Sequence, residues 1–143
     1  MDSTVERHGT YKNYDYLVIN VQGMHFCAYV RIPEEHPFYK VPYDRIPIDC
    51  HGGLTFSEFT DFAPLKKLVY DSAFLGFIWS GNWVKENIQK GYWIGWDYAH
   101  FGDWMPYLPE EGSKKWTPDE IALEAKLVIE QIVKEAENER ARM

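Results

Sequence analysis

The C-terminal segment, residues 116–143, carries the strongest structural signal in the sequence. Thr117 is typical of a helix N-cap, Pro118 of the first helical position, and Glu120 of the third position in a capping box. Apolar residues then recur at helical spacing and form one stripe: Ile121, Ala125, Val128, Ile132 and Ala136. Because a helix with one apolar stripe has to bury it against another layer, the rest of the chain must supply that layer.

The preceding residues predict strands. Residues 14–22 and 25–32 are rich in β-branched and aromatic side chains, and Gly23 between them suits a hairpin turn. Shorter strand-like segments follow at 48–50, with a continuation at 54–59, at 72–81 and at 92–100. Residues 33–47 contain four prolines and are predicted to be a loop. We therefore expect an α+β fold, in which a mostly antiparallel β-sheet carries the long C-terminal helix on one face.

A chain of 143 residues is long enough for one domain with its own core. We predict a flexible tail at 1–10 and a single domain at 11–143. The net charge of −7 and the lack of a basic run argue against binding of double-stranded nucleic acid through its phosphates. No apolar run has the length of a membrane span, and the N-terminus lacks the apolar core of a signal peptide. Cys27 and Cys50 do not resemble a disulfide framework, so we expect a cytoplasmic protein without membrane contact.

Two segments combine ionisable side chains with glycines directly after predicted strands. DCHGGLTFSE at 49–58 contains His51, and GWDYAHFGD at 95–103 contains His100. If the two strands are neighbours, both imidazoles face one pocket, because loops at strand ends collect functional residues. The candidate catalytic residues are His51, His100, Asp97 and Asp103. The candidate ligand-binding residues are Gly52, Gly53, Thr55, Ser57, Trp96, Tyr98, Phe101 and Trp104.

Three kinds of site fit these residues. In the first, two histidines act as base and acid near neutral pH, and Asp97 or Asp103 fixes the tautomer of one ring. The amides of the glycine pair could then bind an anionic oxygen, a set that suits phosphodiester chemistry without a metal. The second is a metal site made by His51 and D-x-x-H-x-x-D at 97–103. Its spacing matches no familiar metal motif, so we predict no metal ligand and no other cofactor. In the third, the rings around Asp97 stack a base, although alternation along the strand requires some of them to be core.

Several motifs together resemble one group of proteins. They are CAYVRIP at 27–33, HPFYKVPYD at 36–44, HGGLTFSE at 51–58 and WIGWDYAHFGD at 93–103, followed by the terminal helix. Over nearly its whole length the chain resembles a family of small phage and mobile-element proteins of Gram-positive bacteria. The resemblance implies a site at the two histidine-containing motifs and implies no particular chemistry. The chain departs from the family pattern at Ala28, where glycine is common, and at Trp96 and Phe101.

Small phage proteins with one ligand-sized pocket often counter host defences by binding or cleaving nucleotide signals. We therefore predict a counter-defence protein that binds a nucleotide-like immune signal, either a cyclic dinucleotide or an ADP-ribose derivative. Cleavage by a hydrolase that uses His51 and His100 stays open. Two alternatives remain, an acidic inhibitor of a host defence nuclease or CRISPR complex and a metal-dependent hydrolase. The aromatic content of 17% is also consistent with a homodimer, because aromatic residues concentrate at interfaces.

Overall fold

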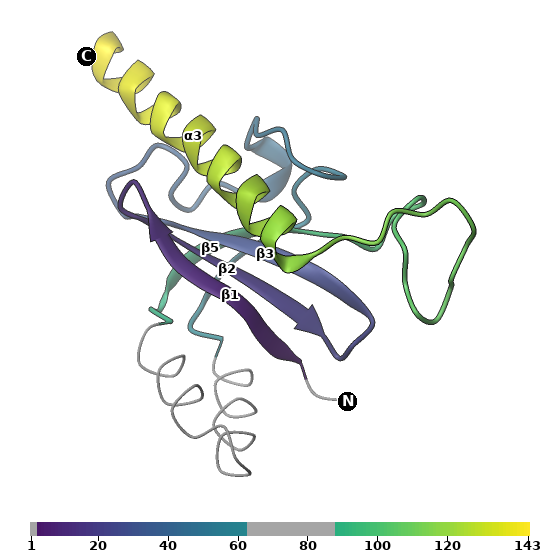
Figure 1. The fold of residues 1–143 in the computed structure, drawn as a ribbon. Coiled ribbons are helices and arrows are strands. Elements are labelled where there is room, and N and C mark those ends of the chain that lie inside the picture. The colour runs from purple at the N-terminus through teal and green to yellow at the C-terminus, as the bar shows by residue number, and fades with distance from the viewer. Residues whose placement is uncertain (1–2, 63–87) are drawn as a thin grey trace.

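The computed structural model describes residues 3–62 and 88–143 (Figure 1). Its strands are β1 (Thr4–Tyr11), β2 (Tyr14–Val21), β3 (His25–Ile32), β4 (Phe56–Thr60) and β5 (Gly91–Asp97). They form one antiparallel sheet in the order β1-β2-β3-β5-β4. The helix α3 (Pro118–Arg142) lies across one face of this sheet, over β1, β2 and β3 (Figure 1). The predicted α+β fold is confirmed, whereas the strand predicted at 72–81 lies outside the described residues.

Alternation along the strands gives the sheet two apolar faces. The face under α3 buries Val18 on β2, Val30 on β3 and Ile94 on β5. The helix covers them with residues that are fully buried: Ile121, Ala125, Val128, Ile129 and Ile132. The opposite face buries Leu17 and Trp93. The interior strand β5, which lies between β3 and β4, is therefore covered on both faces.

The start of α3 is built as the sequence predicts. The Thr117 hydroxyl accepts a hydrogen bond from the Glu120 amide (3.3 Å), and the Glu120 carboxylate accepts one from the Thr117 amide (3.0 Å). This capping box satisfies two amides that would otherwise lack partners in the first turn. Arg7 on β1 donates to Asp119 (2.8 Å) and so links the same turn to the edge of the sheet.

Replacing Thr117 with alanine should lower the free energy of unfolding by about 1 kcal/mol, because an amide of the first turn loses its acceptor. Equilibrium unfolding in urea measures this loss. Thr117→Ser keeps the hydroxyl and should stay close to the wild type. Equal losses in both variants would show that the hydroxyl does not stabilise the helix.

The flexible tail predicted for residues 1–10 is wrong from residue 4 onward, because Thr4–Tyr11 forms the strand β1. β1 pairs with β2 from Thr4, opposite Asn20, to its last residue. Lys12 and Asn13 form the turn between the strands with φ of 49° and 71°, the left-handed conformation that a two-residue hairpin turn needs. Lys12 also forms an ion pair with Glu130 of α3. β1 is therefore ordered by contacts with residues that are distant in the sequence. No local pattern in its polar sequence predicts these contacts.

The segment between β3 and β4 is a loop, as its prolines predict, with one short 3-10 helix, η1 (Tyr43–Arg45). The strand predicted at 48–50 does not form. The Gln131 side chain of α3 forms two hydrogen bonds with the backbone of Asp49. It accepts one from the amide (2.9 Å) and donates one to the carbonyl (2.7 Å). Because a helix side chain occupies these groups, they are not available to a neighbouring strand, and the next strand begins only at Phe56.

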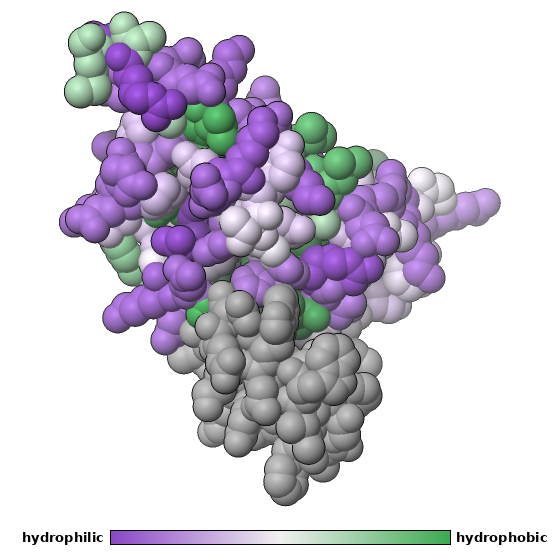
Figure 2. All heavy atoms as spheres, turned by 60° about the vertical axis from the view of Figure 1, so that its left-hand side comes forward, coloured by the Kyte–Doolittle hydropathy of each residue, from purple (hydrophilic) through white to green (hydrophobic). Residues whose placement is uncertain are grey.

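Polar side chains cover most of the face shown in Figure 2, and apolar residues lie there in separate patches. In the described ranges, 3–62 and 88–143, no helix is both long enough and apolar enough to cross a bilayer.

Candidate functional site

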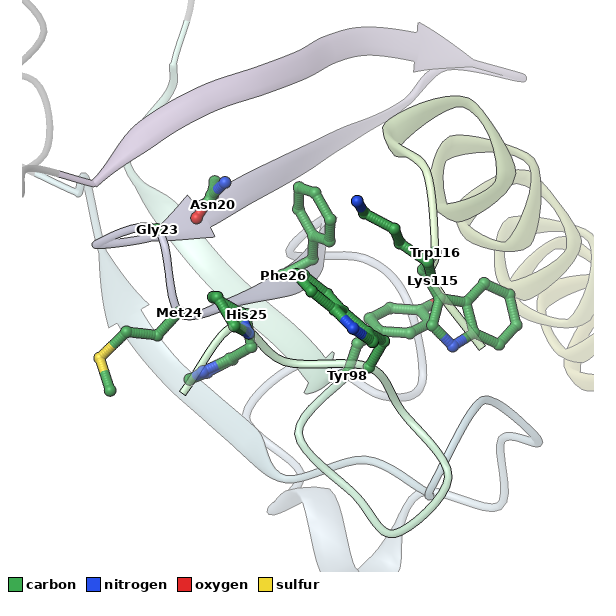
Figure 3. Close-up of a pocket in the computed structure, with 10 residues that line it drawn as sticks. Asn20, Gly23, Met24, His25, Phe26, Tyr98, Lys115 and Trp116 are labelled. Carbon is green, nitrogen blue, oxygen red and sulfur yellow. The ribbon is translucent and has the colours of Figure 1, made fainter. Parts of the chain in front are cut away.

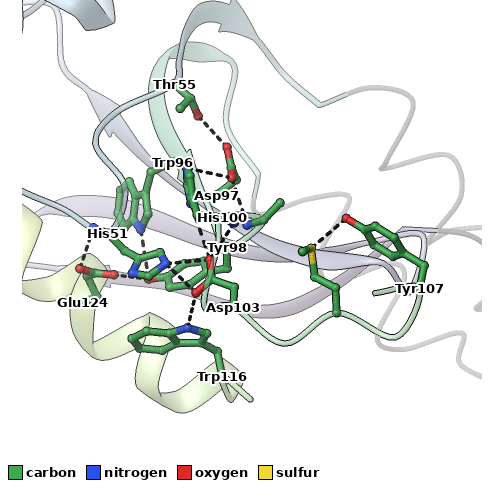
Figure 4. Close-up of polar contacts among 12 residues, drawn as sticks. His51, Thr55, Trp96, Asp97, Tyr98, His100, Asp103, Tyr107, Trp116 and Glu124 are labelled. Atoms are coloured by element: carbon green, nitrogen blue, oxygen red, sulfur yellow. Dashed lines mark hydrogen bonds and ion pairs between the residues drawn. The ribbon is translucent and has the colours of Figure 1, made fainter. Parts of the chain in front are cut away.

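A buried carboxylate, Asp103, joins the two histidine-containing segments (Figure 4). It accepts hydrogen bonds from His51 Nε2 (2.8 Å), from Trp116 Nε1 (2.8 Å) and from the backbone amide of His100 (3.0 Å). These donors come from the loop before β4, the residue before the N-cap of α3 and the loop after β5. We call His51, His100 and Asp103 the histidine cluster.

The environment of Asp103 keeps its carboxylate charged. Burial on its own would raise the pKa of Asp103, which is 4% exposed. The hydrogen bonds from His51, the His100 amide and Trp116 outweigh burial and lower this pKa below its usual value. The cluster therefore contains a fixed negative charge at neutral pH.

Two aromatic rings and a hydrogen bond to its backbone amide fix the position of His51. Its ring stacks on Tyr98 at 4.6 Å between centroids with planes 6° apart, and it meets the Trp116 ring edge-on at 4.9 Å. Its backbone amide donates to Glu124 of α3 (3.0 Å). Because a charged carboxylate can only accept, the neutral ring of His51 carries its proton on Nε2 and a lone pair on Nδ1. Asp103, one of the two aspartates predicted for this role, thus fixes the tautomer.

His100 lies directly against the backbone of Gly52. A Cβ atom at position 52 would lie 2.3 Å from the His100 ring, and Gly52 has a φ of +71°. The His100 ring is 5.6 Å from that of His51. Its Nδ1 is 3.6 Å from Asp103, and its Nε2 is 3.6 Å from Asp97. The two histidine rings contact each other edge-on, and glycine at 52 makes their approach possible.

The other polar candidates lie around this centre in different roles. Thr55 donates to Asp97 (3.1 Å), which also accepts from the Ala99 amide (3.1 Å) and so shapes the turn after β5. Ser57 accepts from the Tyr43 amide (3.0 Å) and supports η1. The Gly53 amide donates to the Cys50 carbonyl (3.0 Å), so the predicted anion site at the glycine pair loses one of its two donors.

The predicted stacking rings separate into three environments. Trp96 is 1% exposed in the core under α3, so its prediction as a ligand contact is wrong. Phe101 is 96% exposed on the loop after β5. Trp104 lines a pocket, and Tyr98, which is 2% exposed in the same core as Trp96, borders it. Trp96 Nε1 donates to the Tyr98 hydroxyl (3.1 Å), which donates to Glu124.

Cys50 directly precedes His51, and its surroundings disfavour the nucleophilic thiolate form. Burial, with the nearby carboxylates of Glu124 and Asp49, raises the pKa of the Cys50 thiol to about 12. At neutral pH the sulfur is protonated and unreactive, because the thiolate is the nucleophilic form.

The pocket that Tyr98 and Trp104 line has a volume of 230 Å³ (Figure 3). Its walls come from the β2–β3 turn, the start of β3 and the segment between β5 and α3. Half of its ten lining residues carry aromatic rings, and one is a lysine: Phe26, Tyr98, Trp104, Trp116, His25 and Lys115. Figure 3 shows Phe26, Lys115 and Trp116 on one side and Asn20, Met24 and His25 on the other. Tyr98 and Trp116 contact His51 as well, so they separate the pocket from the histidine cluster.

Sequence reasoning missed several of these residues, among them Phe26, Lys115, Trp116 and Glu124. Of these residues, the sequence could place Trp116 beside the start of the helix, because it directly precedes the predicted N-cap. Its hydrogen bond to Asp103 and its contact with His51 depend on how distant segments meet, which no motif encodes.

The cluster has two chemical capacities. An imidazole oriented by a carboxylate can act as a general base, and His51 with Asp103 has this arrangement. Ligand atoms of His51, His100 and Asp103 also lie within 4.8 Å of one another, close enough to share one metal ion.

Comparison of the chain with protein-family models, with curated proteins and with solved structures yields no match. The resemblance to the phage family therefore stays a prediction, and functional inference rests on the site itself.

Proposed function

We propose that the chain binds one nucleotide-like small molecule in the pocket between the β2–β3 turn and the segment before α3. The observation that carries this proposal is the combination of aromatic walls with one ammonium group in a single pocket. Such a lining offers flat surfaces for a base and a positive charge for a phosphate.

The rings supply the first half of the recognition. Trp104 and Trp116 are half-buried, and their indoles line the pocket with the rings of Phe26 and Tyr98. A nucleobase stacked on such a side chain gains about 1–3 kcal/mol, and every base offers a face for this contact. The ligand that we propose therefore contains a planar base, and stacking alone does not select which base it is.

The charge supplies the second half. Lys115 Nζ lies 4.5 Å from the centre of the Trp104 ring, so the ammonium group is close to the surface where a base would stack. An anionic group joined to that base would reach Lys115 without a further cation. The net charge of −7 acts against the approach of any anion, so a phosphate needs this local positive group to be held.

The size of the pocket limits the ligand. A volume of 230 Å³ is below the range of about 300–1,000 Å³ for drug-sized ligands. One base with its sugar and phosphate at the mouth fits this volume, whereas a cyclic dinucleotide would leave its second base outside. Of the two predicted ligand classes, the pocket favours one nucleotide unit, such as the adenosine half of an ADP-ribose derivative.

The proposal is for binding and not for cleavage, because His51 and His100 do not line this pocket. Sequestration of a nucleotide immune signal is the counter-defence role consistent with it. The predicted acidic inhibitor and metal-dependent hydrolase stay alternatives.

Replacing Lys115 with alanine should weaken nucleotide binding about 10- to 150-fold, because a charge-assisted contact is worth about 1.5–3 kcal/mol. A thermal-shift panel of nucleoside monophosphates, cyclic dinucleotides and ADP-ribose would select the ligand, and calorimetry would give the dissociation constants. Lys134→Ala is the matched control, because Lys134 is exposed on α3 and does not line the pocket.

No stabilisation by any nucleotide would end the proposal. Equal weakening in both lysine variants would show that general charge, and not the pocket, attracts the ligand.

A further inference from the structure

We infer that His51, His100 and Asp103 bind one divalent metal ion of the zinc class. This site is separate from the nucleotide pocket and does not depend on the proposed function. Each residue contributes one ligand atom, and the three atoms lie within 4.8 Å of one another.

The donor atoms are already close to coordination spacing. His51 Nε2 is 2.8 Å and His100 Nδ1 is 3.6 Å from the Asp103 carboxylate. Atoms bound to a tetrahedral zinc ion at about 2.0–2.1 Å are about 3.3 Å apart. Small side-chain rotations therefore suffice for coordination. The ion would replace the proton that His51 Nε2 now shares with Asp103.

A second observation independently points to a ligand at this place. His100 Nδ1 is buried and has no hydrogen-bond partner among the described residues. Buried polar atoms are rarely left without a partner, and an exception calls for an explanation. This nitrogen faces the charged Asp103 carboxylate, so a cation between them would satisfy both groups.

The surroundings have the features of a metal site. If His100 binds through Nδ1, its proton lies on Nε2, which is 3.6 Å from Asp97. A carboxylate behind a metal-binding histidine commonly fixes its tautomer and orientation. Trp116 and the His100 amide hold Asp103 from behind.

The donor set also indicates the class of ion. Two imidazole nitrogens and one carboxylate oxygen suit zinc and its neighbours better than magnesium or calcium, which prefer oxygen ligands. Three protein ligands leave at least one position open for water or for a ligand atom.

The test is calorimetric titration of Zn²⁺ into the full chain after chelator treatment. We expect one ion per chain and no competition from Mg²⁺. His51→Gln and His100→Gln should each weaken binding at least about tenfold, and Asp97→Asn about tenfold through the orientation of His100. Co²⁺ in place of Zn²⁺ should give visible absorption bands that His100→Gln removes. Circular dichroism verifies that each variant folds.

His8→Gln is the matched control, because His8 lies on β1 outside the cluster. Binding that survives in His8→Gln and is lost in the cluster variants supports the site. Absence of Zn²⁺ binding in the wild type, or undiminished binding in both cluster variants, overturns it.

Discussion

Asp103→Ala should lower the free energy of unfolding by about 3–5 kcal/mol, measured in urea with chelator present. The carboxylate accepts from His51, Trp116 and the His100 amide, so its removal leaves three donors without their acceptor. Each buried donor without a partner costs about 1–3 kcal/mol, with relaxation and water entry offsetting part of the sum.

Two controls make this result specific. Asp103→Asn keeps one acceptor oxygen, so its free energy of unfolding should fall less than that of Asp103→Ala. Asp44→Ala, at an exposed position of η1, should change stability by less than about 0.5 kcal/mol. A loss below about 1 kcal/mol for Asp103→Ala would mean that the cluster does not hold the loops together.

Gly52→Ala should destabilise the protein by about 2–4 kcal/mol and displace the His100 ring. A left-handed backbone costs a residue with a Cβ atom about 1–2 kcal/mol, and that atom would lie 2.3 Å from the imidazole. Gly53→Ala is the matched control, because Gly53 has a similar φ of +82° but nothing within 4 Å of an added Cβ. It should show the backbone cost alone.

A double-mutant cycle separates the two contributions. Adding His100→Ala to Gly52→Ala removes the ring that the new methyl group meets, so the double variant should lose less than the sum of the single losses. Strict additivity would show that Gly52 is required for its backbone conformation and not for the approach of His100.

Local signals predicted those elements whose causes are local. The capping box at Thr117 and Glu120 identified the start of α3, because its partners lie within one turn. The hairpin around Gly23 was predictable for the same reason. β1 was missed because its partners are β2 and α3, and its turn at Lys12 and Asn13 lacks the usual glycine.

The sequence indicated which two segments contain the site residues, but not how their side chains contact one another. His51 and His100 contact each other because their segments adjoin the neighbouring strands β4 and β5. The contacts that position them come from Trp116, just before α3, and from Glu124 on α3. Ring type did not distinguish core from pocket, since Trp96 is buried in the core and Trp104 lines the pocket. Only tertiary packing decides such cases.

The most direct test of the central claim is a two-dimensional NMR titration of ¹⁵N-labelled protein with the best nucleotide from the panel. The indole N–H signals of Trp104 and Trp116, which line the pocket, should shift in proportion to occupancy. The indole of Trp93, which donates to the Gln89 carbonyl beside the opposite face of the sheet, should not move. Unchanged signals from Trp104 and Trp116 at saturating nucleotide, or a shift confined to Trp93, would contradict the account.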